Sequence, residues 1–485
     1  MSNSVQYTVH LQRKSAELVG RLWVRPCRER LLASFGYDAD WLQTPSAFPL
    51  SPDLPFDAHP TVREGLFLCL TDCLPGEWGQ RLLLRKKELQ EEQARSAAGR
   101  SGKPRRRPHA LEAVLTFLRN DATRMGALRF SADGGARFTG ASEEEACPGL
   151  HDLEALCMAT QRFFAGTADL AETNLLVRAG ASLAGRRPRG IVSAEDGTLY
   201  VAHLPAPGDE RDRPLWEYVT LELASRAGLR IAECRLEKVA GRNVLLVRRC
   251  DRVGAQRIPF LSGRSLLQAR GHSETDLAGM ATVLQQEGAA VRKDLQEIWN
   301  RLVFSACVHA TNSDLGSWGF MREDFGWRLA PVGSLEPSLP WESTSRAGLL
   351  HEGALDAAAA RFVRMADLFR LKEQEAQSRL EAFREALSQW RDVAEEAGAD
   401  PEEAERMQLV YGGSGKASLI ASPVLESLDA EAEPGWELPS EAPVREPEAS
   451  ADAKGSVAAD SRDAPATDTE TSAGTKTTDA ENTDA

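Results

Sequence analysis

The sequence predicts an α+β fold: a β-rich N-terminal domain, a second strand-rich domain, a helical C-terminal lobe and a disordered acidic tail. Alternating apolar residues, punctuated by Pro and Gly, dominate the beginning of the chain, and hairpin patterns dominate its middle. Apolar residues at helical spacing follow. The predicted boundaries within the 485 residues are 1–135, 136–255, 256–415 and 416–485.

The N-terminal domain is predicted to be mainly β-structure, because residues 17–42, ELVGRLWVRPCRERLLASFGYDADWL, alternate as strands do. Residues 85–107 are polar and predict a helix that runs into a mobile loop. That loop carries a basic cluster, Lys103, Arg105, Arg106 and Arg107. The cluster could contact phosphate groups, but a solvated loop is the preferred interpretation.

Residues 180–253 predict two hairpins separated by a helix. The first hairpin turns at Asp196-Gly197 and the second turns near Gly241. The helix between them is amphipathic and ends at Gly228. Hairpin, helix and hairpin followed by a helical lobe is the order of a kinase small lobe leading into a large lobe.

The C-terminal lobe has the periodicity of helices. Its apolar residues recur at spacings of three and four: Phe362, Met365, Leu368, Phe369 and Leu371, then Leu380, Phe383, Leu387 and Trp390. Gly398 ends one helix, and Asp400-Pro401 begins the next.

Most of the net charge of −14 belongs to the C-terminal tail. From Pro423 onward, sixteen Asp and Glu residues stand against four Lys and Arg, a net charge of −12, which leaves −2 for the rest. The tail has few large apolar side chains and cannot offset its chain entropy by burial, so we expect it to be disordered. The acidity therefore says little about what the folded part binds.

Cysteine usage and hydropathy predict a reduced, cytoplasmic protein. The eight Cys residues are scattered, without a CxxC pair or a Cys/His spacing suited to zinc, so we predict no metal site from them. No apolar run is long enough to cross a bilayer, and the N-terminus lacks the layout of a secretion signal. We expect no membrane contact.

Several sequence blocks, in order, resemble the HipA family, the serine/threonine kinase toxins of bacterial toxin–antitoxin pairs. These are GRLW, FGYDADWL and PLSPDLPF, then LPGEWGQRLLLR, DATRMGALRF, GASLAGRRPR and LLVRRCDR. The resemblance runs from about Val19 to Met407. It implies a HipA-like fold, ATP and Mg²⁺ as cofactors, and a small helix-turn-helix antitoxin as partner. DNA would be reached only through that partner.

The resemblance also implies a nucleotide site. Its candidate residues are Ser182, Ala184, Gly185 and Arg186 in the glycine-rich segment, His203, and Arg248, Arg249 and Cys250 at the end of a strand. Ser182 aligns with the serine that family kinases autophosphorylate, although a plain turn serine is an equally open interpretation. His203 stands where the family has its phosphate-binding Lys, and a short, mostly neutral His is a poor substitute. Glu217 is the expected partner of that Lys, and without it Glu217 could simply be a solvated helix residue.

Family members carry a catalytic loop that reads roughly N-x-D-D-H-x-x-N. Asn312 and Asp314 align with its start, so Asp314 is the candidate catalytic base. Gly316 and Ser317 mark where the His and the metal-binding Asn should be. Ser334 stands where a metal-binding Asp belongs, and a neutral hydroxyl cannot offset the charge of Mg²⁺ and phosphates as a carboxylate does. We therefore interpret Ser334 as part of a degraded metal site.

The tripeptide Asp324-Phe325-Gly326 spells the D-F-G motif of eukaryotic protein kinases. Its place between WGFM and WRLAP predicts a hairpin turn instead, with Gly326 supplying the permissive backbone angle. Glu323, Asp324 or Glu336 could be a metal ligand that has migrated, but solvent-facing turn residues are the preferred interpretation of all three.

Two functions from different classes compete. The favoured hypothesis is a pseudokinase or strongly impaired kinase that acts through nucleotide or partner binding, because the positions of the Lys, the Asn and the metal Asp are all changed. The alternative is an active serine/threonine kinase toxin that uses ATP to phosphorylate a translation-related protein, such as glutamyl-tRNA synthetase, and itself. A weaker third hypothesis is direct DNA contact through residues 105–107.

Overall fold

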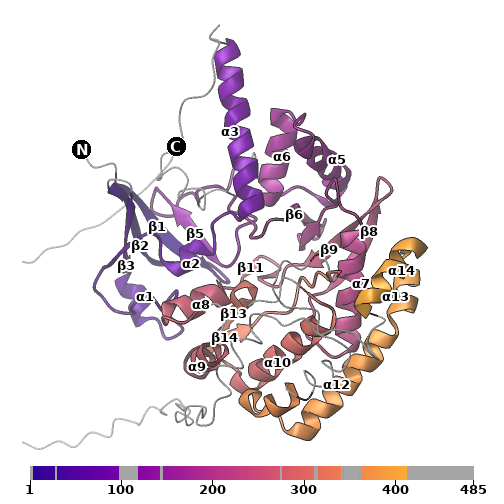
Figure 1. Ribbon diagram of the computed structural model, residues 1–485. Helices are drawn as coiled ribbons and strands as arrows, with labels where there is room; N and C mark the ends of the chain where they lie inside the picture. Colours follow the sequence, from indigo (N-terminus) through magenta and orange to yellow (C-terminus); the bar gives the residue numbers. More distant parts are fainter. Residues whose placement is uncertain are drawn as a thin grey trace, which may run out of the picture. The chain divides into compact units, whose positions relative to one another are not determined.

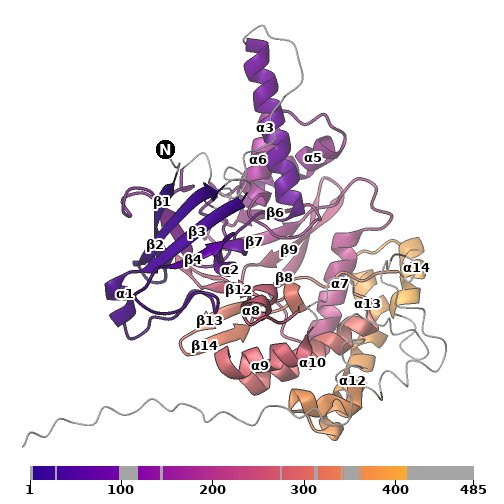
Figure 2. The ribbon, with the colours of Figure 1, turned by 60° about the vertical axis from the view of Figure 1, so that its left-hand side comes forward.

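A five-stranded antiparallel sheet organises the N-terminal part in the computed structural model (Figures 1 and 2). The strand order is β4-β3-β2-β1-β5. The strands are β1 (Val5–Gln12), β2 (Ala16–Cys27), β3 (Arg30–Tyr37), β4 (Thr61–Glu64) and β5 (Leu128–Ser131). In β2, Leu22 and Val24 are buried while Arg21 and Arg25 are exposed, as the period of two requires. The prediction of strands in residues 17–42 is confirmed up to Tyr37, but wrong for its last residues, which form the short helix α1 (Ala39–Gln43) capped by Asp38.

The structure describes residues 4–27, 30–97, 118, 120–142, 146–273, 276–310, 315–339, 342, 360 and 362–411. The predicted acidic tail and basic loop cluster therefore lie outside the described residues. No helix in the described part of the chain is both long enough and apolar enough to span a bilayer.

The middle of the chain contains a four-stranded sheet with the order β6-β7-β9-β8. Its strands are β6 (Arg189–Ser193), β7 (Leu199–His203), β8 (Cys234–Val239) and β9 (Arg242–Arg248), and α7 (Arg213–Arg226) packs against β8 and β9. Gly197, Gly228 and Gly241 all have positive φ, at 82°, 84° and 77°. The two hairpin turns and the end of the helix are thus confirmed, because glycine tolerates these angles best.

Three helices pack together beside this sheet. They are α3 (Glu77–Ala97), α5 (Leu153–Phe164) and α6 (Leu170–Gly180), and Figure 1 shows α3 extending beyond α6. Two short helices, α1 (Ala39–Gln43) and α2 (Leu68–Thr71), belong to the N-terminal part. The sequence analysis made no specific prediction for α5 and α6.

The C-terminal part is mostly helical. Its α-helices among the described residues are α8 (Gly263–Ala269), α9 (Leu277–Glu287), α10 (Val291–Cys307), α12 (Glu373–Ser388), α13 (Trp390–Glu396) and α14 (Pro401–Tyr411). Gly398 has φ 78° and α14 begins at Pro401, as predicted. Two short strands, β10 (Arg252–Val253) and β11 (Gln256–Arg257), form a hairpin. A small sheet of β12 (Phe260–Ser262), β13 (Gly319–Glu323) and β14 (Gly326–Leu329) lies among the helices.

The D-F-G tripeptide lies at the tip of the β13–β14 hairpin, as predicted. Glu323 pairs with Gly326, and the Phe325 side chain is 90% exposed. The predicted role of Gly326 was wrong, because its φ is not in the positive region. A Cβ at this position would instead lie 2.6 Å from the Glu287 carbonyl oxygen, so the glycine permits close contact between backbones.

One continuous hydrophobic core joins the three parts. It contains Leu22 of the N-terminal sheet, Leu245 of the middle sheet and Phe383 of α12, each at most 3% exposed. The segments that resemble catalytic motifs are therefore attached to well-packed elements.

Candidate functional site

Four side chains meet at the place where the family resemblance predicts the phosphates and the metal. Nδ1 of His203 lies 2.6 Å from Oε2 of Glu217. The hydroxyl of Ser334 donates to Oε1 of the same carboxylate at 2.5 Å, and Arg189 donates to that hydroxyl at 2.9 Å. We call these four residues, Arg189, His203, Glu217 and Ser334, the central quartet.

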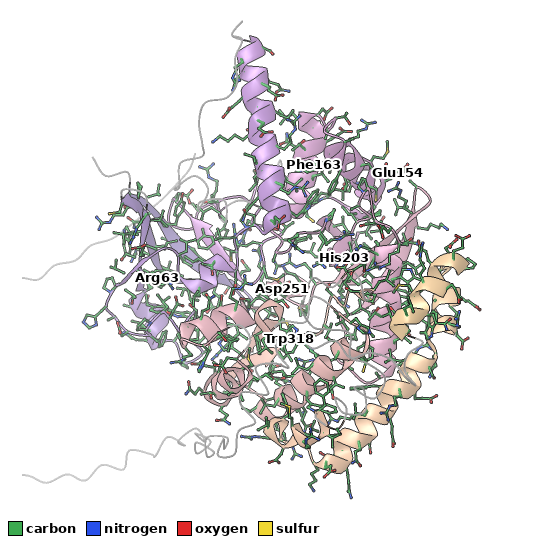
Figure 3. All side chains as sticks on the ribbon, viewed as in Figure 1. Arg63, Glu154, Phe163, His203, Asp251 and Trp318 are labelled. Carbon is green, nitrogen blue, oxygen red and sulfur yellow. The ribbon has the colours of Figure 1, made fainter. Side chains whose placement is uncertain are left out.

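The sheet and helix α7 bring the central quartet together. Arg189 on β6 is directly opposite His203 on β7, so the two side chains share a face of the sheet. Asp212 caps α7 by accepting a hydrogen bond from the Leu215 amide, which fixes where the helix starts and directs Glu217 at this face. Figure 3 labels His203, which lies on β7 of the middle sheet.

The electrostatics of the central quartet favour a neutral imidazole and an ionised carboxylate. Burial and the nearby Arg189 guanidinium lower the pKa of His203, so its Nδ1–H donates to Glu217 at neutral pH. Burial alone would raise the pKa of Glu217, but His203, Arg189 and Ser334 together lower it to about 2. The idea that Glu217 is a solvated helix residue is wrong, since it is only 5% exposed.

The described residues here do not suit Mg²⁺. Ser334 replaces a carboxylate, both oxygens of Glu217 are engaged, and Arg189 brings a positive charge within 3.9 Å of Glu217. Within the described ranges, no group of three or more His, Cys, Asp or Glu side chains could hold a metal ion. Glu336 is not a solvent-facing turn residue as expected, because it forms an ion pair with Arg213.

The glycine-rich segment is held by the start of α3. The Gly76 amide donates to the Leu183 carbonyl at 2.9 Å, and the Trp78 amide donates to the Gly185 carbonyl at 3.1 Å. A Cβ on Gly76 would lie 2.5 Å from the Gly185 nitrogen, so the close contact depends on glycine there. Ala184, Gly185 and Arg186 are exposed, which leaves this face of the segment accessible.

Ser182 faces inward. Its side chain is 8% exposed, and its hydroxyl lies 2.9 Å from the Thr123 hydroxyl and 3.1 Å from the Thr123 carbonyl. A phosphoryl group could reach this oxygen only if the segment moved.

The predicted nucleotide-binding residues at the end of β9 differ in their surroundings. Arg249 is 4% exposed and donates to both oxygens of Asp251, at 2.8 and 2.6 Å, and to the Thr123 carbonyl at 2.6 Å. Arg248 instead is exposed and pairs with Glu233 at 2.8 Å. Cys250 is half-buried, and burial raises the pKa of its thiol to about 11. Arg249 therefore has a structural role in this arrangement.

Asp251 and Asp121 are the two acids of a buried ionic lattice that joins the DATRMGALRF and LLVRRCDR blocks. Asp251 accepts from Arg249 and Arg252, each at 2.6 Å, and from the Gly126 amide at 2.7 Å. Although burial alone would raise it, the two arginines lower the pKa of Asp251 to about 2. Asp121 is paired in the same way with Arg124, Arg129 and Arg257. Figure 3 shows Asp251 between the N-terminal sheet and the middle of the chain.

The candidate base Asp314 lies outside the described residues, as does Asn312. The structure resumes with the short 3₁₀-helix Leu315–Ser317, which includes Gly316. On the other side, His309 adopts φ 53° and is 3% exposed. Neither ring nitrogen of His309 has a hydrogen-bond partner among the described residues, and burial lowers its pKa to about 4.

Sequence analysis missed Arg189. In GASLAGRRPR it stands at the position of the final Lys of the family segment S-x-G-G-A-R-P-K, which gave no indication of contact with Ser334. Pairing of the two predicted hairpin strands could have found it, since a turn at Asp196-Gly197 places residue 189 opposite residue 203.

Comparisons with known proteins bear on the family and the fold of the chain. Residues 9–100 match the HipA N-terminal domain, and residues 181–391 match the HipA-like C-terminal domain. The HipA of Shewanella oneidensis MR-1, solved with HipB and operator DNA, is 14% identical with a TM-score of 0.53, covering 84% of this chain and 95% of that chain. The proinflammatory kinase CtkA of Helicobacter pylori is 12% identical with a TM-score of 0.36, covering 48% of this chain and 90% of that chain. No curated protein sequence matches the chain.

Proposed function

The chain belongs to the HipA family, and from that premise we propose that it is a pseudokinase or strongly impaired kinase that acts by binding a nucleotide or a protein partner. The observation that supports this proposal is the set of contacts within the central quartet. In phosphoryl transfer, a Lys grips the phosphates and acidic or amide side chains hold the metal. Here His203 and Ser334 occupy two of those positions, and both contact Glu217.

Charge supports the proposal. A kinase site gathers a cation on the protein and a metal ion so that together they neutralise the triphosphate. The central quartet has one guanidinium and one carboxylate, with a neutral imidazole and a hydroxyl between them. That set has no excess negative charge with which to hold a divalent cation. ATP, if it binds, would do so weakly and without depending on Mg²⁺.

A partner of the HipB type is part of the proposal. The solved Shewanella complex contains HipA, HipB and operator DNA, and this chain has the same fold. A small helix-turn-helix antitoxin would carry the DNA contact, so that this chain reaches DNA only indirectly. Co-purification with the product of an adjacent gene tests this part of the proposal.

Incubation with labelled ATP tests the loss of phosphoryl transfer. The full chain is incubated with Mg²⁺ or Mn²⁺, in parallel with Asp314→Asn and with the control Arg30→Gln on the exposed Arg30–Glu64 pair. We expect no label above background on any of the three. Strong labelling that disappears in Asp314→Asn and persists in Arg30→Gln would establish the active kinase toxin instead.

A further inference from the structure

A segment that directly follows the small sheet crosses the site. We call residues 331–339, together with Glu342, the strap. Val332 joins residues 230–232 as a parallel bridge, with the Ala232 amide donating to the Val332 carbonyl and the Val332 amide to the Arg230 carbonyl, both at 2.8 Å. Leu335 and Leu339 are each 4% exposed. The strap is therefore packed into the protein and contributes Ser334 to the central quartet.

Two carboxylates of the strap form ion pairs with arginines at the start of α7. Glu336 pairs with Arg213, and Glu342 pairs with Arg211. Arg211 also donates to the Pro337 carbonyl at 2.8 Å, and Arg213 reaches Glu342 at 3.5 Å. The Arg211 side chain is only 3% exposed, and within the described part of the chain its Nε has no hydrogen-bond partner.

The positive and negative charges at the start of α7 balance only when the strap is included. Asp209 pairs with Arg187 at 2.7 Å and lies 3.3 Å from Arg213. With Glu336 and Glu342 present, the three guanidiniums of Arg187, Arg211 and Arg213 pair with three carboxylates. Without the strap, Asp209 would be the one carboxylate of the described residues still within ion-pair distance, on Arg187 and Arg213, and Arg211 would have none. An excess of guanidinium groups over carboxylates, beside the amino end of a helix, favours the binding of a chain of phosphate groups.

We propose that Arg187, Arg211 and Arg213 form a binding site for the phosphate chain of a nucleotide, and that Glu336 and Glu342 occupy it in cis. The strap and the ligand then compete for the same arginines. This inference rests on the proposed function, because it explains how a chain without the usual Lys and metal carboxylate still binds a polyphosphate. Displacement of the strap would also withdraw Ser334 from Glu217, which couples binding to the central quartet.

Binding of ATP and of inorganic triphosphate tests the proposal, measured by calorimetry in EDTA so that metal plays no part. Glu336→Gln removes one strap charge and keeps a hydrogen-bonding side chain on the partly exposed Arg213. We expect both ligands to bind up to about fivefold more tightly than to the unaltered chain, as for the loss of one competing ion pair. Equal gains for the two ligands assign the effect to the phosphate chain, and a gain for ATP alone would overturn the assignment.

Two matched variants complete the test. Glu237→Gln breaks a surface ion pair of β8 with Arg235 and should leave the affinity unchanged. Arg213→Gln added to Glu336→Gln should abolish the gain. Hydrogen exchange of residues 331–339 gives an independent readout that does not need a variant, and exchange there should rise when triphosphate binds to the unaltered chain.

The outcomes separate this inference from the proposed function. Unchanged affinity in Glu336→Gln, a gain that survives loss of Arg213, or no binding to either chain overturns the strap proposal. Labelling by ATP that requires Asp314 overturns the proposed function whatever the strap does.

Discussion

His203 and Glu217 are joined by a hydrogen bond of 2.6 Å between two side chains that are each 7% exposed. A strand and a helix are thereby linked at the place where the family resemblance predicts the Lys–Glu pair of a kinase. The link differs in one respect from an ammonium–carboxylate pair. The imidazole is neutral at pH 7, because burial and Arg189 lower its pKa, so the site loses a cation without losing the connection.

Replacement of His203 by Ala should destabilise the protein markedly. Glu217 would keep Ser334 and Arg189 but lose a partner of a buried charge, so the free energy of unfolding should fall by about 2–4 kcal/mol. Denaturant unfolding measures it. The control His59→Ala removes a His that is 93% exposed beside Asp57, and should change the value by less than about 0.5 kcal/mol. Equal effects of the two substitutions would rule out a stabilising role for the His203–Glu217 bond.

His309 should make stability depend on pH in the acid range. The folded protein lowers the pKa of His309 from 6.5 to about 4 by burial, so the unfolded chain binds a proton first as the pH falls. The contribution is fully present above pH 6.5, is lost as the pH falls from 6.5 to 4, and should amount to about 3 kcal/mol.

Unfolding of His309→Asn across this pH range checks the effect. Asn tolerates the left-handed backbone at φ 53°, so the substitution should preserve the local fold. The variant should lose less stability between pH 6.5 and pH 4 than the unaltered protein, while His59→Asn should behave like the unaltered protein. An identical pH dependence in His309→Asn would mean that folding does not lower the pKa of His309.

Local patterns predicted the elements well and the site only partly. The turns at Gly197 and Gly241 follow from backbone angles that few residues adopt, so the sequence carries that information locally. The role of Glu217 depends on where Ser334 and Arg189 lie in space, 117 positions later in the chain for Ser334. Because the Lys is missing, the sequence suggested that Glu217 is solvated. In the fold this side chain is buried, and its carboxylate is hydrogen-bonded by other polar side chains.

Gly326 and Glu336 show the same limit. A glycine in a hairpin sequence suggests a permissive angle, but here the required property is space beside Glu287 and Ala289. Glu336 has the sequence context of a turn residue, and only the fold places Arg213 beside it. In each case the deciding neighbour is distant in sequence, where periodicity gives no information.

Asp251→Asn should be among the most destabilising single substitutions in the chain. It would remove the charge partner of Arg249 and Arg252, which are buried with it, and such a loss costs about 3–5 kcal/mol. Thermal or denaturant unfolding measures the change. Arg248→Gln, one residue before Arg249, breaks only the exposed pair with Glu233 and should cost less than about 1 kcal/mol. If Asp251→Asn lowered the free energy of unfolding as little as this control, the ion pairs of Asp251 would not contribute to holding the two blocks together.

Gly76→Ala should release the glycine-rich segment from α3. The new Cβ would lie 2.5 Å from the Gly185 nitrogen and 2.8 Å from its carbonyl oxygen, and neither backbone atom can rotate away. We expect faster hydrogen exchange and easier proteolysis in residues 182–187, and a loss of about 1–3 kcal/mol in stability. Gly36→Ala is the matched control, because its nearest neighbour would be a Pro60 side-chain carbon at an ordinary 3.6 Å. Unchanged protection of residues 182–187 in Gly76→Ala, with the fold intact, would show that the segment is held by contacts other than those with the start of α3.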